Sequence, residues 1–248
     1  MNKGIGKFLL VFLFLLTVKN IYSQTCGFGC LGLSGFYGGY TYQQYQADGL
    51  NQYLENILLS NNSSQSSNIK KFTYALGFRI GANVLRLNYK DFIISLKGYY
   101  QFLKEEKNPF TFSDTKYSLT NNYWGTGLDF GYSVFSFMDV KFIDAEVTFH
   151  SVDLKIENLS DPSDQETDFN NRSIRGYSIG SGLIFKIIDD YIGVELTAGY
   201  TNFKIDNLTD ENNNYLLGEN KSLSDGKDFI KSGGIFVTAQ LNVGIPLY

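Results

Sequence analysis

The only histidine of the chain, His150, stands beside residues that could take part in acid–base or nucleophilic chemistry. Ser151 and Asp153 follow it closely, and histidine, serine and a carboxylate are the groups of a hydrolase triad. In an extended strand, however, residues 150 and 151 face opposite sides. The pair therefore forms one site only if a bulge intervenes. The favoured interpretation is a polar residue on an inner wall, with a membrane-embedded hydrolase or acyltransferase as the lesser alternative.

Two groups of acidic residues are candidates for holding a divalent cation through carboxylate oxygens. The first group comprises Asp161, Asp164, Glu166 and Asp168, and the second comprises Asp206, Asp210 and Glu211 beside Asn212–Asn214. Neither group has the fixed spacing of a calcium loop. The sequence favours solvated acidic loops and predicts no metal site, no cofactor and no catalytic residue.

Five charged residues stand within otherwise apolar, alternating segments: Arg79, Lys97, Asp129, Glu146 and Glu195. Counted back from the nearest short turns, these residues lie at similar heights along their segments. All five are at positions expected to face the inside of the barrel. Unpaired charges in a narrow interior are costly. We therefore expect these side chains to form ion pairs in one layer that plugs the lumen of a barrel.

The stretch from Gly233 to Tyr248 shows the kind of element that would position them. Every second residue from Ile235 to Leu247 is apolar, whereas the alternate positions carry Phe236, Thr238, Gln240 and Asn242. This period of two over about fourteen residues exceeds the usual strand of about five or six. Apolar outside and polar inside is the pattern of a strand in a membrane barrel.

Seven further segments alternate in the same way. They are residues 31–42, 72–87, 92–104, 123–136, 140–156, 174–188 and 191–205. In the fifth, the parity changes from Phe149 to Val152, which predicts a bulge near Ser151. Long polar connections (43–70, 105–121, 157–173 and 206–230) alternate with short turns. Aromatic residues gather near both ends of the segments, Phe72 and Trp124 among those at the long-loop end, as at two membrane interfaces.

Eight such strands resemble the small outer-membrane barrels, of which the transmembrane domain of outer-membrane protein A is the type. The resemblance covers residues 24–248 and rests on pattern without a signature motif. It implies an all-β, eight-stranded antiparallel up-and-down transmembrane β-barrel. Tyr248 departs from the group's pattern, because it is out of phase with Ile245 and Leu247, so the insertion machinery is expected to read this end differently.

The N-terminus predicts export. Lys3 and Lys7 precede an apolar run of about eleven residues, Phe8 to Val18, and this pattern is typical of a signal peptide cut after Ser23. Cutting there removes Lys3, Lys7 and Lys19 but no acid, so the net charge falls from −4 to −7. An acidic mature chain argues against nucleic acid as a partner. Cys26 and Cys30 are candidates for a local disulfide at the N-terminal lip.

One segment of the first long loop breaks the period of two. Leu50, Tyr53, Leu54, Ile57 and Leu58 form one stripe of a short helix, and Asp48 stands at its N-cap position. So short a helix must pack on something. Two options stay open: a lid over the barrel mouth, or a surface at which Leu50, Leu54 and Ile57 contact another envelope protein.

The sequence therefore predicts a non-enzymatic integral protein of the outer membrane of a Gram-negative-type bacterium, in contact with its lipids. A structural or accessory subunit of an envelope or secretion assembly is the first interpretation of its role. A narrow pore or a small-ligand or lipid-binding barrel is the second.

Overall fold

The computed structural model describes residues 35–60, 70–107, 115–158, 167–188, 191–219 and 225–244. Eight strands and one helix follow one another along these residues. They are β1 (Gly35–Gln44), α2 (Asp48–Ser60), β2 (Tyr74–Tyr89), β3 (Phe92–Lys107), β4 (Thr115–Phe135), β5 (Met138–Asn158), β6 (Thr167–Ile188), β7 (Ile192–Phe203) and β8 (Ile235–Gly244). The signal-peptide prediction for residues 1–23 and the predicted Cys26–Cys30 pair lie outside the described residues.

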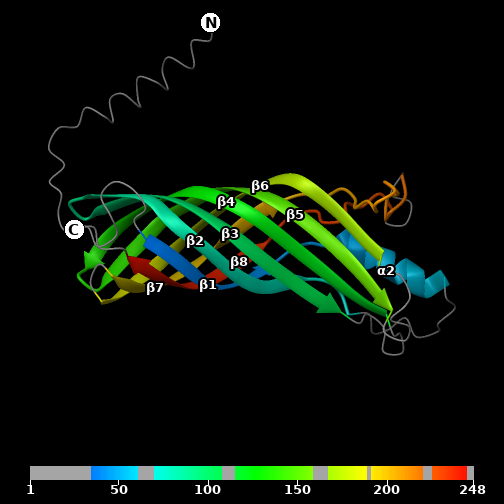
Figure 1. Ribbon diagram of the computed structural model, residues 1–248, viewed down its shortest axis with the longest axis horizontal. Coiled ribbons are helices and arrows are strands. Elements are labelled where there is room, and N and C mark those ends of the chain that lie inside the picture. Colours follow the sequence, from blue (N-terminus) through cyan, green and yellow to red (C-terminus); the bar gives the residue numbers. More distant parts are fainter. Residues whose placement is uncertain are drawn as a thin grey trace, which may run out of the picture.

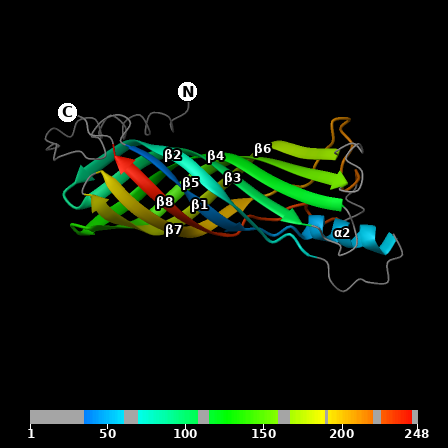
Figure 2. The same ribbon diagram turned by 60° about the horizontal axis from the view of Figure 1, so that its bottom comes forward.

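The strands form one closed barrel in which each pairs antiparallel with its neighbours in the chain, and β8 pairs back onto β1 (Figures 1 and 2). The predicted eight-stranded up-and-down barrel is thereby confirmed. Closure satisfies the backbone hydrogen-bonding groups of both edge strands.

The wall of the barrel is uneven in height. β4, β5 and β6 have 21, 21 and 22 residues, whereas β1 and β8 have 10 each. The sequence placed the starts of the fourth and sixth strands too late: β4 begins at Thr115 and β6 at Thr167. Much of the expected loops 105–121 and 157–173 is therefore strand, and the polar outward residues there misled the prediction.

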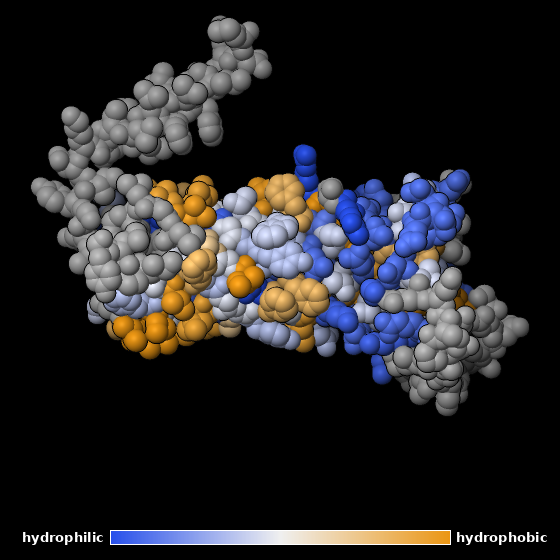
Figure 3. Space-filling view, in the orientation of Figure 1, coloured by the Kyte–Doolittle hydropathy of each residue, from blue (hydrophilic) through white to orange (hydrophobic). Residues whose placement is uncertain are grey.

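Apolar side chains cover the outside of the barrel from the short turns to about the level of Trp124. Figure 3 shows these side chains toward the short-turn end and hydrophilic ones toward the end that carries α2. Outward aromatic side chains lie exposed near both limits of this band: Tyr89, Phe92, Phe135, Phe137 and Tyr191 at one limit, and Tyr74, Trp124, Phe149, Tyr177 and Tyr200 at the other. This arrangement matches the apolar band and aromatic girdles of a membrane barrel.

Beyond Trp124 the polarity of both faces is inverted. The outward positions of β4 become Asn122, Thr120 and Lys116, whereas the inward residues Leu119 on β4 and Leu154 on β5 are fully buried. We call this part, where the tall strands extend past the apolar band, the overhang. No helix in the described ranges is long and apolar enough to cross a membrane.

The inversion also explains a wrong detail of the sequence analysis. The pairing of β5 with β6 does shift between His150 and Val152, but the extra residue belongs to β6, near Arg172. Val152 keeps the inward parity of His150 and is fully buried. The apparent change of parity in β5 was a change of polarity in an unbroken strand.

Candidate functional site

Lys97 of β3 is the centre of an ion cluster in the middle of the lumen. Its Nζ lies 2.6 Å from Asp144, 2.7 Å from Glu146 and 3.2 Å from Asp129. All four side chains are buried. Three carboxylates around one ammonium group offset part of the cost of removing these charges from water.

Lys141 and Arg79 extend this cluster to opposite sides. Lys141 Nζ lies 2.8 Å from Asp129 and 2.5 Å from Glu195. Glu195 accepts further hydrogen bonds from Gln240 and Asn242 of β8. These contacts link β4, β5, β7 and β8 across the lumen.

Arg79 of β2 completes the other side of the cluster. Its Nη1 lies 3.4 Å from Glu146, and its Nε donates to Gln101 at 2.8 Å. The guanidinium also lies over the ring of Tyr99, 3.9 Å from the ring centroid. Glu146 in turn accepts bonds from Tyr99 and Ser178. We call Arg79, Lys97, Asp129, Lys141, Asp144, Glu146 and Glu195 the lumen cluster.

The structure brings all five charged residues named by the sequence into this one cluster, and it adds Lys141 and Asp144. Lys141 was missed because β5 bulges between it and Asp144, so both face inward although their numbers differ in parity. Asp144 has the parity of Glu146 and could have been named from the sequence. The adjacent outward residues Phe142 and Ile143 are both exposed. Two consecutive apolar residues in an alternating strand were the available signal of this bulge.

A second, smaller ion group lies toward the short turns. Asp139 of β5 binds Arg86 of β2 at 3.2 Å and Lys186 of β6 at 2.8 Å. A small cavity of about 20 Å³ separates this group from the lumen cluster, between Arg86 and Glu195. It has room for roughly one water molecule.

His150 lies on the long-loop side of the lumen cluster, in a layer of aromatic rings. Its Nδ1 is 3.0 Å from the Asn121 side-chain oxygen, and its Nε2 is 2.8 Å from the Thr148 hydroxyl. The ring stacks on Phe203 and contacts Tyr123. The structure does not bring Ser151 into this layer, because its side chain points from the other face of β5.

Above this layer the interior becomes an apolar core, which α2 and residues 203–219 and 225–232 close. Leu50 and Leu54 of α2, Leu119 and Leu154 of the overhang, and Ile205, Leu217, Phe229 and Ile230 are all buried there. Phe72 is buried in the same core, which corrects its expected place in an outward aromatic belt. We call α2 together with residues 203–219 and 225–232 the cap.

Backbone contacts fix the start of α2. The amides of Gly49 and Leu50 donate to the carbonyls of Asp228 and Phe229, so the first turn finds its acceptors in the neighbouring segment of the cap. Asp48 is exposed and none of its described contacts caps the helix, contrary to the sequence analysis. Asn51 instead joins α2 to the chain that returns from it: its side chain donates to the Phe72 carbonyl and accepts from the Phe72 amide.

Glu105 of β3 binds both ends of the segment between β1 and β2, which contains α2. It accepts from the Tyr45 hydroxyl at the start and from the Thr73 amide at the end, and Lys107 lies 3.0 Å away. Burial, and then the adjacent Glu105, raise the pKa of Tyr45 well above its usual value. Tyr45 therefore stays protonated and continues to donate.

These contacts correct the expected partner surface on α2. Leu50 and Leu54 are fully buried against the cap core, so they cannot contact another protein in this state. Tyr53 and Ile57 are half-buried, and Tyr53 packs on the same core. The side chain of Leu58 lies outside the described residues. For Leu50 and Leu54, the lid is the arrangement that the structure contains.

Of the acidic loop residues, Asp161, Asp164 and Glu166 lie outside the described residues, whereas Asp168, Asp206 and Asp210 have local partners. Asp210 accepts from the amides of Asn212 and Asn214 and from the Asn214 side chain. These hydrogen bonds, the side-chain one first, lower the pKa of Asp210. Among the residues that the structure describes, no group of three or more His, Cys, Asp or Glu side chains is arranged to hold a metal ion.

The fold and this interior define the class: a small, closed, eight-stranded barrel with an apolar belt outside and a filled lumen. Solved outer-membrane barrels resemble it. They include Ail, the attachment invasion locus protein of Yersinia pestis (TM-score 0.43, 11% identity, 86% of this chain and 98% of that chain). Neisserial surface protein A also matches (TM-score 0.43, 16% identity, 86% and 99%).

The outer membrane protease OmpT from Escherichia coli is a third match (TM-score 0.41, 11% identity, 86% of this chain and 95% of that chain). No protein-family model and no curated protein matches the sequence. The assignment of the fold therefore rests on the strand order and closure of this chain itself.

Proposed function

We propose that the chain is an integral outer-membrane protein whose barrel is closed to ions and anchors a folded external cap, without enzymatic activity. The observation that carries this proposal is the filling of the interior at successive levels. The lumen cluster occupies the membrane level, and the apolar core of the cap occupies the overhang. Each level by itself blocks a continuous column of water.

The contacts of the lumen cluster support a plug more than a pore. Lys97 and Lys141 are each held by at least two carboxylates within 3.2 Å. Releasing either lysine to let ions pass would leave buried carboxylates unpaired, at a cost of roughly 3–5 kcal/mol. The cavity of about 20 Å³ on the short-turn side is far smaller than a channel.

The surroundings of His150 support a structural role for this residue. Both ring nitrogens have neutral hydrogen-bond partners, and the ring is stacked between Tyr123 and Phe203. A general base must reach the proton that it abstracts, whereas the His150 side chain is enclosed by barrel and cap. His150 thus positions the aromatic layer between the two levels.

Conductance in planar lipid bilayers tests the closed state. The purified mature protein should insert and produce no stable current steps. A variant in which a short Gly-Ser linker replaces residues 47–71 should also stay closed, because the lumen cluster remains. Large, stable steps from the intact protein would contradict the proposal, and steps from the linker variant alone would show that the cap is the only plug.

We further propose that the cap serves a structural or accessory role in an envelope assembly. The support is that the cap is a folded unit tied to the barrel by Asn51 and Glu105. Affinity purification in mild detergent tests this role. A stoichiometric envelope protein that is recovered with the intact chain and lost with the linker variant is the expected result, and recovery of a lone monomer from both would contradict it.

A further inference from the structure

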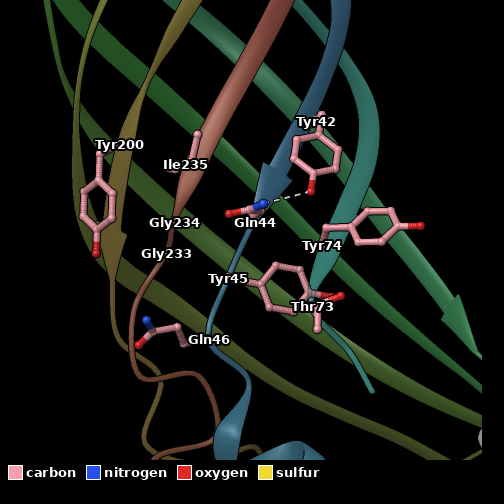
Figure 4. Close-up of a pocket in the computed structure, with 10 residues that line it drawn as sticks. All are labelled: Tyr42, Gln44, Tyr45, Gln46, Thr73, Tyr74, Tyr200, Gly233, Gly234 and Ile235. Atoms are coloured by element: carbon pink, nitrogen blue, oxygen red, sulfur yellow. Dashed lines mark hydrogen bonds between the residues drawn. The ribbon is translucent and has the colours of Figure 1, made fainter. Parts of the chain in front are cut away.

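A pocket of about 420 Å³ opens on the outer wall of the barrel, where the chain leaves β1 for α2 (Figure 4). Its size falls within the range of roughly 300–1,000 Å³ typical of small-ligand sites. Tyr42 and Tyr74 lie on one side of it and Tyr200 on the other. These tyrosines belong to the outward aromatic residues at the long-loop limit of the apolar band.

The pocket arises from a break in the seam between β1 and β8. Regular pairing ends at Gln43 and Phe236, and it resumes with a bridge between Gln46 and Ser232. The side of Ser232 has one residue more over this interval, and two of its residues are glycines. A Cβ atom on Gly233 would lie 2.2 Å from the Thr201 carbonyl oxygen, and one on Gly234 would lie 2.7 Å from that of Gln44. At both positions the neighbouring backbone leaves no room for a Cβ atom, so residues 233 and 234 contribute no side chain to the pocket.

The pocket is lined by uncharged hydrogen-bonding groups and aromatic faces. The rings of Tyr42 and Tyr74 stack at 5.3 Å, and Gln44 Nε2 donates to the Tyr42 hydroxyl at 3.1 Å. Gln46 adds a second, exposed amide side chain. The hydroxyls of Tyr74 and Tyr200 have no hydrogen-bond partner among the described residues.

None of the ten lining residues is charged. Lys107 lies over the Tyr74 ring, 5.3 Å from its centroid, but it is bound to Glu105 at 3.0 Å. A phosphate group would therefore find no free cation in the lining. A neutral ligand rich in hydroxyl groups would find amide, phenol and backbone partners.

We propose that this pocket binds the sugar headgroup of a glycolipid in the outer leaflet. The amides of Gln44 and Gln46 hydrogen-bond the sugar hydroxyls, and the negative faces of the tyrosine rings attract its C–H groups. The exposed Ile235 on the same wall meets the lipid chains. A lipid source fits better than a free sugar, because the pocket opens at the aromatic belt. This inference rests on the membrane location proposed above.

Lipid retention by the purified mature protein tests the proposal. The protein is equilibrated in mixed micelles with equal amounts of monoglucosyl diacylglycerol and phosphatidylcholine of the same chains, and retained lipid is counted by native mass spectrometry. We expect about tenfold more glucolipid than phosphatidylcholine. A tenfold preference corresponds to about 1.4 kcal/mol, which two additional hydrogen bonds can supply. Q44A/Q46A and Y200A should each lose most of it.

Tyr177→Ala is the matched control, because Tyr177 lies in the same belt but outside the pocket. It should keep the preference. Equal retention of both lipids by the intact protein, or an equal loss in the control, would overturn the proposal. Retention of the glucolipid no tighter than that of methyl glucoside at the same concentration would assign the site to free sugars and overturn the lipid source. A heat-dependent shift in gel mobility checks insertion separately, so a folded protein without preference contradicts this inference alone.

Discussion

The membrane part of the barrel and its overhang are made from the same strands with opposite polarity. Along β5, the outward residues change from Val147 and Phe149 to Asp153 and Lys155, while the inward residues change from Glu146 to Leu154. In lipid the strand buries its polar face and exposes its apolar one. In water it does the reverse, and only there does an apolar core need a lid. In the membrane location proposed above, the level at which the polarity inverts marks the membrane surface.

The two levels also differ in the forces that hold them together. The lumen cluster depends on a few strong ion pairs, each of which leaves a buried charge if its partner is removed. The cap core depends on many apolar contacts of similar size, and its stability falls in smaller steps. Substitutions at the two levels should therefore differ in how much stability they remove and in how far through the protein that loss extends.

The largest effect is expected for Lys97→Met, which leaves Asp129, Asp144 and Glu146 without their central cation. Loss of one partner from a buried ion group costs roughly 3–5 kcal/mol. The barrel as a whole should lose stability, measured as a lower midpoint of urea unfolding in detergent micelles. Lys104→Met is the control, because the Lys104–Glu106 pair is exposed and such pairs contribute about 0–1 kcal/mol. Equal effects of the two changes would contradict the clustered lumen.

A smaller and more local effect is expected for Leu54→Ala in α2. Leu54 is fully buried in the cap core, and such truncations cost about 2–5 kcal/mol. Amide hydrogen exchange in α2 should accelerate, while the unfolding midpoint of the strands stays the same. Leu241→Ala, on the outward face of β8, should change neither. An equally large loss of barrel stability would mean that the two levels unfold as one unit.

The smallest effect concerns the exposed turn held by Asp210. Its pKa is lowered by hydrogen bonds to the charged carboxylate, so the turn is stabilised above the unfolded value of about 3.9 and loses this support as the pH falls through the lower, folded value. The Asn214 amide should exchange faster once the pH falls below about 4, after correction for the intrinsic rate. D210A, which has no side-chain acceptor, should exchange fast at all pH values, and a protected amide in that variant would contradict this account.

The sequence was sufficient to predict the barrel and the inward position of the five charged residues first named in the lumen. An unbroken period of two shows which residues share a face, and a charge on an otherwise small or polar face must lie inside. Lys141 was missed because a bulge changes the parity between it and Asp144, whereas Asp144 has the parity of Glu146 and could have been named. The tall strands were predicted too short because the residues of β4 beyond Trp124 were judged by their polarity. Polarity inverts there, whereas the alternation of inward and outward positions continues.

The sequence could not show what α2 packs against, for a different reason. Its apolar stripe shows that it must pack on something, yet the stripe is the same whether a lid or another protein is the partner. The covering groups come from Phe72, Leu119 and Phe229, which are remote in the chain. Only the register of the tall strands and the placement of residues 203–219 and 225–232 bring them together.

Accessibility along the outward face of β4 tests the central claim most directly. In a chain with Cys26 and Cys30 replaced by serine, a nitroxide label is placed in turn at Lys116, Thr120, Asn122, Thr126, Leu128 and Phe130 of the lipid-reconstituted protein. Collision with oxygen should dominate at the three positions below Trp124, and collision with a water-soluble nickel complex should dominate at the three above it. A continuous oxygen-accessible face from Lys116 to Phe130 would contradict the inversion, as would a nickel-accessible Leu128.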